Sequence, residues 1–282
     1  MCAEPRGRPS CRRSTSVLRA DLSELRALAI ELADRAAAIH QQGRERGFEI
    51  DEKSAAGDLV TEVDRAAERA IVDGIVASRP DDAILGEEGA DREGTSGVRW
   101  VIDPLDGTAS FVLGYPGYSV SIGVEIDGRP AVGVVVDALG RRTEGAIGQG
   151  AFRDGSRARP AGRTTLEGAV IATGFGYAPQ MRVAEARTLA RLIDRVADIR
   201  RSGSAAFDLC AVACGEVDAY YELHLAPWDI AAGRVIVEAA GAEFRRFAQP
   251  DGEVLTVAVP VQLLEPLLAL LAGAGLAVSE PA

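Results

Sequence analysis

The stretch from Trp100 to Phe111 reads WVIDPLDGTASF. Its apolar start predicts a buried strand, and the strand ends in two acids, Asp103 and Asp106, with Pro104 between them. Burying an ionised carboxylate is costly unless a positive group pairs with it. The two acids therefore predict one of three surroundings: a bound cation, an arginine, or solvent at an exposed strand end.

The composition is that of an ordinary globular protein. The chain has 282 residues, of which 47% are hydrophobic and 26% are charged, enough for a large core or two packed subdomains. The net charge of -11 argues against nucleic acid as a partner, because phosphate backbones bind basic surfaces. An anionic substrate would need a metal ion or a local arginine to offset this acidity.

The scarcity of some residue types excludes several classes of site. Lys53 is the only lysine, so no Gly-Lys-Ser/Thr phosphate loop can form. His40 and His224 are the only histidines, which rules out a histidine-rich zinc site. Many acids and few histidines favour a hard, oxygen-binding cation such as Mg²⁺. The cysteines form no disulfide framework, and Cys210 and Cys214, four apart in a helical pattern, are predicted to be small core residues.

Apolar periodicity predicts alternating helices and strands, as in a layered α/β or α+β fold. Helices are expected at residues 18–39, within 58–78, and at 182–197, 205–214, 230–240 and 261–278. Strands are expected within 82–89 and at 97–102, 118–126, 129–137, 143–152, 168–174, 217–223, 242–247 and 254–259. The pair Asp127-Gly128 between two strands predicts a hairpin.

The chain is predicted to divide into a tail and one folded unit. Residues 1–17 carry Arg, Pro and Ser without an apolar segment, which indicates a disordered tail and no secretory signal. Residues 18–282 form the folded part, with subdomains of about 18–158 and 159–282. The apolar stretch near the end contains Glu265 and Pro266 and fits a core helix better than a membrane span. A cytoplasmic protein without membrane contact is therefore expected.

Acidic residues gather where predicted elements begin or end. They are Asp58 beside Thr61, Glu87 beside Glu88, Asp103 with Asp106, and Asp229. Each alone could be only a helix cap or a turn residue. Together, with apolar strands leading several of them toward one region, they favour a shared site.

Metal-assisted hydrolysis of a phosphate ester would use such a site. Two or three Mg²⁺ ions need carboxylates from several directions, and the bend at Pro104 would let Asp103, Asp106 and the Leu105 carbonyl converge. The amides of Gly107 and Thr108 could face a phosphate. The Thr108 hydroxyl could hold a water for in-line attack, while paired ions activate the water and stabilise the leaving oxygen.

The chain resembles the inositol monophosphatase family of Mg²⁺-dependent, lithium-sensitive sugar phosphatases. The matching segments are DLVTEVD (58–64), GEEG (86–89), WVIDPLDGT (100–108), RRSGSAAFDLC (200–210) and DAYYELHLAPWDIAAG (218–233), followed by EAAGAEF. They span nearly the whole chain after residue 18, and the DPLDGT and PWDIAAG motifs together are highly specific. The resemblance implies a layered α-β-α-β-α sandwich and a homodimer.

The resemblance also implies residue roles. The implied metal ligands are Glu87, Asp103, the Leu105 carbonyl, Asp106 and Asp229. Asp58 and Thr108 would orient the attacking water, with Glu87 also catalytic. The implied substrate-binding residues are Asp106, Gly107, Thr108, Gly203, Ser204, Ala205, Glu222 and Asp229, with Glu222 accepting a substrate hydroxyl.

The sequence departs from the family pattern after Thr108 and raises a question at His224. Ala109 and Ser110 follow Thr108, where the family commonly has a residue and then Asn. Ser110 can replace some hydrogen bonds of an Asn but not its amide pair. His224, two residues after Glu222, is either a surface imidazole or a substrate contact.

The expected function is hydrolysis of inositol 1-phosphate or a similar sugar-alcohol monophosphate. The alternatives are the same chemistry on histidinol phosphate, fructose 1,6-bisphosphate or a 3'-phosphoadenosine nucleotide. A bisphosphate would ask for an additional basic group, which Arg200 or Arg201 could supply. A remote alternative is a non-catalytic regulatory protein on the same fold, which predicts loss of a metal ligand, and none is lost.

Overall fold

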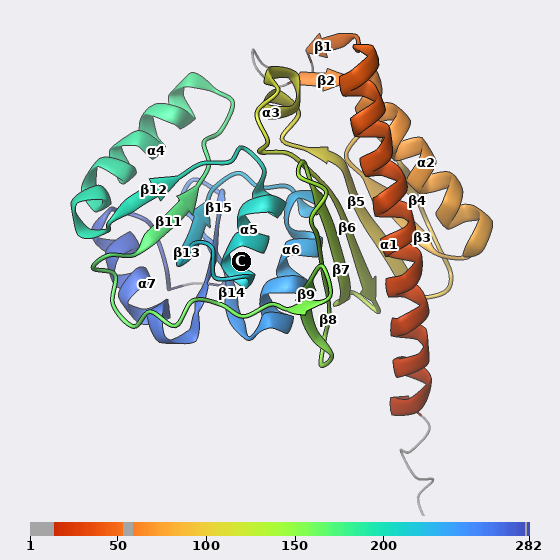
Figure 1. Cartoon of the computed structure of the whole chain (residues 1–282). Helices are drawn as coiled ribbons and strands as arrows, with labels where there is room; N and C mark the ends of the chain where they lie inside the picture. Colours follow the sequence, from red (N-terminus) through yellow and green to blue (C-terminus); the bar gives the residue numbers. More distant parts are fainter. Residues whose placement is uncertain (1–13, 53–58, 280) are drawn as a thin grey trace, which may run out of the picture.

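The fold is organised around a large mixed sheet of eight strands in the order β10-β9-β8-β7-β6-β5-β3-β4 (Figure 1). The structure is a computed structural model that describes residues 14–52, 59–279 and 281–282. The strands of this sheet are β3 (Ala83–Gly86), β4 (Asp91–Arg92), β5 (Val98–Asp106), β6 (Ser119–Ile126), β7 (Arg129–Asp137), β8 (Arg142–Ala146), β9 (Gly150–Arg153) and β10 (Ser156–Arg157). Asp127 and Gly128 both have positive φ, and they close the predicted hairpin between β6 and β7.

The prediction of one strand over 143–152 is wrong. The chain turns back at residues 147–149, so that β8 and β9 form a hairpin with Thr143 opposite Arg153. Gly148 and Gly150 have φ values of 76° and 91°, a conformation that glycine adopts without strain. The two glycines therefore mark a turn inside the apolar run.

A second sheet has five strands in the order β12-β11-β13-β15-β14. Its strands are β11 (Val170–Thr173), β12 (Asp198–Arg200), β13 (Ala219–Glu222), β14 (Ala242–Ala248) and β15 (Val254–Pro260). A separate two-stranded ribbon pairs β1 (Ile50–Glu52) with β2 (Leu59–Thr61). The two larger sheets come from opposite sides of residue 158 in the sequence.

Seven α-helices complete the described part of the chain. They are α1 (Ser14–Arg46), α2 (Glu62–Ser78), α3 (Thr108–Leu113), α4 (Pro179–Leu192), α5 (Ala205–Ala213), α6 (Pro227–Ala240) and α7 (Leu264–Gly273), with 3₁₀ turns at Ile193–Arg195 and Val261–Leu263. Among the described helices, none is both long enough and apolar enough to cross a membrane.

Several helix boundaries differ from the prediction. The first helix begins at Ser14, so residues 14–17 of the predicted tail are helical, and residues 1–13 lie outside the described residues. Pro179 and Pro227 open α4 and α6 earlier than periodicity predicts, because proline suits the first helical turn. The helices predicted over 182–197 and 261–278 are shorter, since 3₁₀ turns occupy the end of one and the start of the other.

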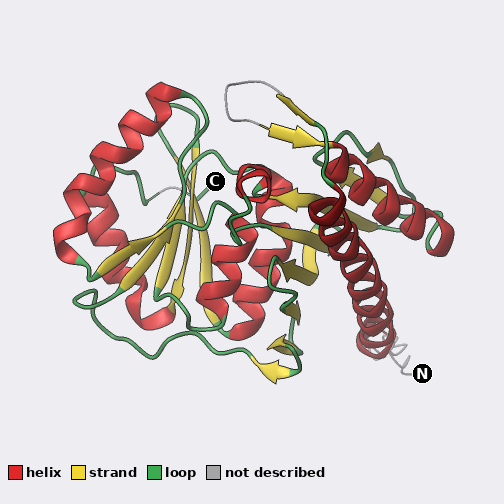
Figure 2. Ribbon diagram, turned by 45° about the horizontal axis from the view of Figure 1, so that its top comes forward, coloured by secondary structure: helices red, strands yellow, loops and turns green. Residues whose placement is uncertain are grey.

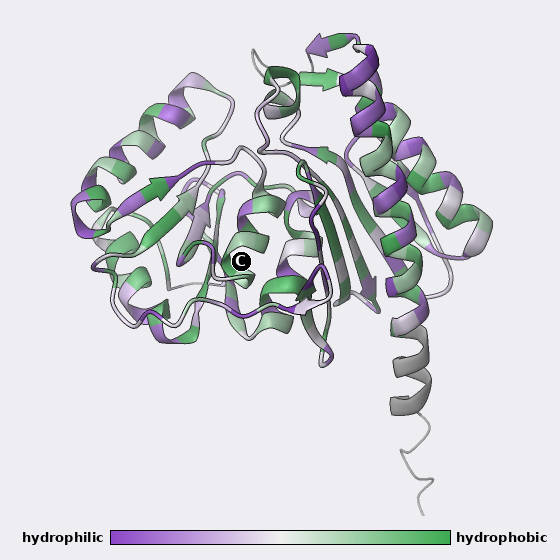
Figure 3. Ribbon diagram, in the orientation of Figure 1, coloured by the Kyte–Doolittle hydropathy of each residue, from purple (hydrophilic) through white to green (hydrophobic). Residues whose placement is uncertain are grey.

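The layers follow the expected α-β-α-β-α order (Figures 1 and 2). Helices α1 and α2 pack their apolar residues on one face of the large sheet. Helices α5 and α6 fill the space between the two sheets, and α7 packs on the far face of the small sheet with the end of α4. Figure 3 shows hydrophobic residues along the central strands, whereas α1 alternates between hydrophilic and hydrophobic residues. The mixed α/β sandwich is thus confirmed.

Close packing of α6 on the large sheet connects the two halves of the chain. A Cβ atom at Gly123 would lie 2.6 Å from the Cβ of Ala231, and one at Gly133 would lie 2.3 Å from the Ala232 carbonyl oxygen. Only glycine on β6 and β7 therefore lets the α6 backbone lie directly on the strands. This approach brings the first turn of α6 to the end of the neighbouring strand β5.

Candidate active site

Strand β5 bends where its two acids lie. Asp103 is paired with Ser121 and Asp106 with Ser119, so three steps along β5 match two steps along β6. Pro104 cannot donate a backbone hydrogen bond, and the Leu105 N–H donates to the Asp103 carboxylate at 3.0 Å. The resulting bulge lets both acids face the same side, as the sequence predicts.

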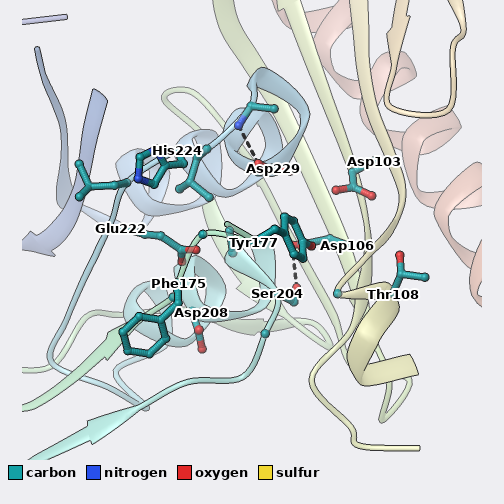
Figure 4. Close-up of a pocket in the computed structure, with 18 of the residues that line it drawn as sticks. Asp103, Asp106, Thr108, Phe175, Tyr177, Ser204, Asp208, Glu222, His224 and Asp229 are labelled. Carbon is teal, nitrogen blue, oxygen red and sulfur yellow. Dashed lines mark hydrogen bonds between the residues drawn. The ribbon is translucent and has the colours of Figure 1, made fainter. Parts of the chain in front are cut away.

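Three carboxylates meet at this bulge (Figure 4). Asp103, Asp106 and Asp229 each offer an oxygen, and these oxygens lie within 4.8 Å of one another. Asp229 comes from the first turn of α6, where its carboxylate accepts the Ala226 N–H at 2.7 Å. Its capping role and its place in the cluster therefore coexist. The Asp103 side chain also interacts with Glu87, which follows β3.

The electrostatics of this cluster are unbalanced. Burial raises the pKa of Asp103 well above its usual value, and the nearby Glu87 carboxylate raises it further. Burial likewise raises the pKa of Asp106 to about 7. Burial, followed by the charge of Asp106, raises the pKa of Asp229 well above its usual value. Repulsion among like charges and loss of hydration both favour the protonated forms.

The surroundings of the three carboxylates favour a cation over an arginine or solvent. Asp103 and Asp106 are 1% and 9% exposed, so the strand end is not simply wet. Within the described ranges, no basic side chain forms an ion pair with any of the three carboxylates. All the donors are hard oxygens, the ligands that Mg²⁺ prefers. The residues present therefore fit a divalent cation.

Hydrogen bonds fix the second carboxylate of the bulge. Asp106 Oδ2 accepts the Ser204 hydroxyl at 2.7 Å and the Ala206 N–H at 2.8 Å. Ser204 is also the N-cap of α5, where its hydroxyl accepts the Phe207 N–H at 3.1 Å. The start of α5 thereby holds Asp106 in a fixed orientation, and it also places the predicted loop of Gly203, Ser204 and Ala205 beside the acids.

The Thr108 hydroxyl has an acidic partner that the sequence reasoning missed. Thr108 donates to Asp64 Oδ1 at 2.9 Å, and its hydroxyl lies 3.1 Å from the Leu105 carbonyl oxygen. Asp64 is fully buried. Its other oxygen accepts the Thr61 N–H at 2.8 Å and the Thr61 hydroxyl at 2.6 Å. The predicted partner of Thr108, Asp58, lies outside the described residues.

A local signal for Asp64 was present in the sequence. Asp64 closes the segment DLVTEVD and stands three residues after Thr61, which is the spacing of a capping box. That spacing predicts that Asp64 is a helix cap. It does not predict a contact with Thr108, which lies 44 residues later in the chain. The long-range hydrogen bond exists only in the folded protein.

The predicted residues share one cavity of about 580 Å³. All the candidate site residues in the described ranges line it, namely Glu87, Asp103, Leu105, Asp106, Gly107, Thr108, Gly203, Ser204, Ala205, Glu222 and Asp229. The cavity also has walls that the prediction missed, and these include Phe175 and Tyr177 from the segment that joins β11 to α4, and Met181 from the first turn of α4. Aromatic and aliphatic walls with a few polar groups are typical of sites for small molecules.

Glu222 lies at the end of β13, on the side of the cavity away from Asp103 and Thr108 (Figure 4). Its Oε2 accepts the Tyr220 hydroxyl at 2.6 Å. Burial raises the pKa of Glu222 to about 8, although the bond from Tyr220 lowers it. Nearby Asp208, another acid of the cavity that was not predicted, has its pKa raised by burial to about 7.

One of the two departures after Thr108, Ser110, is anchored by a hydrogen bond. The Ser110 hydroxyl donates to the Ser202 carbonyl at 3.1 Å and so ties α3 to the segment before α5. Gly107 has a φ of 89°, and a Cβ atom there would lie 2.6 Å from the Gly117 carbonyl oxygen. Glycine at this position thus permits both the left-handed turn and the close backbone approach.

Comparison with known proteins places this five-layered α/β fold, with its buried acidic site at a bulged strand, in a family of phosphatases. Residues 21–274 match the profile of the inositol monophosphatase family, so the chain belongs to that family. The resemblance predicted from the motifs is thereby confirmed.

Named relatives agree with this assignment. The chain is 42% identical over 240 residues to inositol-1-monophosphatase SuhB of Mycobacterium tuberculosis, covering 78% of this chain and 83% of the relative. It is 42% identical over 207 residues to Nus factor SuhB of Escherichia coli K12, covering 72% and 78%. The solved structure of extragenic suppressor protein suhB from Bartonella henselae superposes with a TM-score of 0.81 at 29% identity, covering 90% of this chain and 100% of that one.

Proposed function

We propose that the protein is a Mg²⁺-dependent phosphomonoesterase that hydrolyses inositol 1-phosphate or a similar sugar-alcohol monophosphate. The observation that carries this proposal is the convergence of Asp103, Asp106 and Asp229 within 4.8 Å, beside the Thr108–Asp64 hydrogen bond. Buried acids joined to a positioned hydroxyl are the parts that metal-assisted hydrolysis requires. Family membership supports phosphatase chemistry in general.

The donor set fits two or three Mg²⁺ ions. Glu87, Asp103, the Leu105 carbonyl, Asp106 and Asp229 would hold them, with the buried Asp103 central among the acids. When bound, the ions supply the positive charge that activates a water and stabilises the leaving oxygen. That charge would also keep the carboxylates ionised, which burial alone disfavours.

Thr108 and Asp64 would act on the attacking water. Because the Thr108 hydroxyl gives its hydrogen to Asp64 Oδ1, its lone pairs remain free to accept a hydrogen from water. A proton that leaves the water can then pass through the Thr108 oxygen to Asp64, a carboxylate fixed by two bonds from Thr61. The amides of Gly107 and Thr108 would face the phosphate.

The remaining cavity suits a polyol with one phosphate. Glu222 has one oxygen bound by Tyr220, which leaves the other to accept a substrate hydroxyl. Arg201 is the one arginine among the described residues that line the cavity, and it faces the charges of Asp208 and Glu222. Arg200 instead pairs with Asp198 at 2.5 Å. This balance favours a monophosphate over fructose 1,6-bisphosphate, while histidinol phosphate and a 3'-phosphoadenosine nucleotide are the competing monoesters.

A regulatory role is the second candidate. It is favoured by the relative named Nus factor SuhB, at 42% identity. Such a role is compatible with catalysis, because every implied ligand in the described ranges is present in the cavity. A homodimer, a cytoplasmic location and the division at about residue 158 stay predictions.

Turnover of a panel of phosphomonoesters tests the proposed function. The panel contains inositol 1-phosphate, histidinol phosphate, adenosine 3'-phosphate, fructose 1,6-bisphosphate and p-nitrophenyl phosphate. We expect the highest kcat/KM on inositol 1-phosphate, no turnover in EDTA, and recovery when excess Mg²⁺ is added. Full activity after exhaustive chelation would overturn the metal site, and a protein inactive on every ester with Mg²⁺ would favour the regulatory role.

A further inference from the structure

His224 lies at the substrate end of the cavity and not on the open surface. It follows β13 two residues after Glu222, and its side chain is 18% exposed. Figure 4 shows it beside Glu222, on the side of the cavity away from Asp103 and Thr108. The side chain of His224 is therefore only partly exposed and lines the cavity, and its contact with a substrate stays a prediction.

Two carboxylates flank the imidazole. Nδ1 of His224 lies 2.7 Å from Glu253 Oε2, and Nε2 lies 3.5 Å from Glu185 Oε1. These are ion-pair distances for a protonated ring, and Nδ1 makes no hydrogen bond within the described part of the chain. Glu185 is buried on α4 and accepts the Gly176 N–H with both oxygens, at 3.0 and 3.2 Å. The ring therefore connects the turn before β15 to α4 and the aromatic segment.

The ring also packs directly against that aromatic segment. A Cβ atom at Gly176 would lie 3.3 Å from His224 Cδ2 and 2.9 Å from the sulfur of Met181. Gly176 stands between Phe175 and Tyr177, which both line the cavity. The position of the imidazole thus helps to set the position of the aromatic wall.

His224 stands where two cavities meet. It lines the main cavity of about 580 Å³ and a neighbouring one of about 330 Å³, and both cavities also share Met181, Leu225 and Ala226. The smaller cavity continues to Arg246 and Glu253. A substrate bound by its phosphate at the acids and extending toward the smaller cavity would pass the imidazole, because His224 lines both cavities.

The backbone of His224 is unusual. Its φ is 62°, in the left-handed region that favours glycine, and the other non-glycine residues with positive φ in the described ranges are Asp127 and Asp154. Histidine, like aspartate, is one of the residue types found more often than others in this region. An uncommon backbone conformation beside a pocket is consistent with a role for the side chain.

We propose that His224 is a specificity-determining residue that closes the end of the pocket and restricts it to phosphomonoesters of compact polyols. The inference rests on the proposed function, because it assumes that the phosphate binds at the acids. A polyol ring that ends at Glu222 fits in front of the imidazole. A nucleoside monophosphate, which adds a base beyond its ribose, would need the space that the ring occupies.

Binding of two non-hydrolysable ligands tests this role without turnover. The ligands are the phosphonate analogues of inositol 1-phosphate and adenosine 3'-phosphate, titrated calorimetrically in Mg²⁺. We expect the wild type to bind the inositol analogue more tightly, by about tenfold or more. The variants His224→Gly and His224→Ala should both narrow this preference by about tenfold, mainly through tighter binding of the nucleoside analogue.

The two variants also separate specificity from folding. Glycine suits the left-handed backbone and alanine does not, so His224→Gly should melt at a higher temperature than His224→Ala while both show the same change in preference. A preference that stays within about twofold of the wild type in both variants would overturn the proposal, including the case in which both ligands weaken equally.

Failure of this inference differs from failure of the proposed function. Hydrolysis of p-nitrophenyl phosphate with Mg²⁺ reports the phosphatase chemistry alone. A protein that retains this hydrolysis but shows no preference between the two analogues contradicts the role of His224 only. A protein that prefers the inositol analogue without hydrolysing any ester contradicts the proposed activity, and the change in preference still decides the role of His224.

Discussion

Replacing Asp64 by Asn tests whether Asp64 accepts the Thr108 proton, because the substitution removes that acceptor and keeps the shape of the site. Asp64 Oδ2 receives two hydrogen bonds from Thr61, so the single amide oxygen of the Asp64→Asn side chain would stay on that side. The amide nitrogen would then face Thr108 and donate to its hydroxyl. Thr108 would turn its own hydrogen toward the Leu105 carbonyl, 3.1 Å away, and could no longer relay a proton from water.

The expected effect is large on turnover and small on binding. General-base assistance contributes roughly 10²–10⁴-fold to a rate, and each tenfold corresponds to about 1.4 kcal/mol. Asp64→Asn should therefore lower kcat by roughly 10²–10⁴-fold, or about 3–5 kcal/mol, with KM nearly unchanged. The free energy of unfolding should change by only about 1 kcal/mol, since the helix cap keeps its acceptor.

Thr61→Val is the matched control, because Thr61 bonds to Asp64 but not to Thr108. Loss of the N-cap hydroxyl should lower the free energy of unfolding by about 0.5–2 kcal/mol. Its kcat should stay within about tenfold of the wild type, since the Thr108–Asp64 contact remains. The measurements are steady-state kinetics on inositol 1-phosphate and urea unfolding. If Asp64→Asn kept kcat within about threefold of the wild type, Asp64 would not accept the proton.

Three further outcomes are expected. Asp103→Asn should lower turnover by several orders of magnitude, as expected for a lost ligand, and should abolish the rise in melting temperature on adding Mg²⁺; an unchanged rise would mean that the ions bind elsewhere. In metal-free protein, burial raises the pKa of Asp106 to about 7 and that of Glu222 to about 8. The folded state then binds more protons than the unfolded state between pH 5 and 8, so its free energy of unfolding should fall as pH rises through that window, and stabilisation by Mg²⁺ should grow. Urea unfolding in EDTA at pH 6 and 8 checks the sign, and greater stability at pH 8 would contradict it. Finally, Glu222→Gln should lower kcat/KM on inositol 1-phosphate by about 1.5–3 kcal/mol, the contribution of a charge-assisted hydrogen bond. The loss on p-nitrophenyl phosphate should be much smaller, and equal losses would place Glu222 in the metal site.

Sequence patterns predict an element correctly where the residues that determine it lie close together in the chain. The prediction agrees with the structure for strand β5 with its two acids, for the hairpin at Asp127-Gly128 and for the helix that carries Asp229. Each of these elements depends on an apolar run or on turn residues within a few positions of the chain. The motifs also gave the family, which fixed the order of the layers. The boundary at Pro227 and the turn at residues 147–149 differ from the prediction, because a helix-starting proline and the conformation of glycine outweigh periodicity there. The first helix also begins earlier than predicted, at Ser14.

Only the tertiary structure decided which acids meet and which residues each one contacts. Asp64 looks like a helix cap in the sequence and becomes the partner of Thr108 only when α2 packs near the end of β5. Glycine disfavours strands, so Gly123 and Gly133 look unfavourable in the sequence. In the structure they let the α6 backbone pack directly on β6 and β7, which places Asp229 close to Asp106. His224 lines the cavity, and the two acids beside its ring, Glu185 and Glu253, come from α4 and the turn before β15. A local pattern carries no information about contacts between residues far apart in the chain, and a catalytic site is made of such contacts.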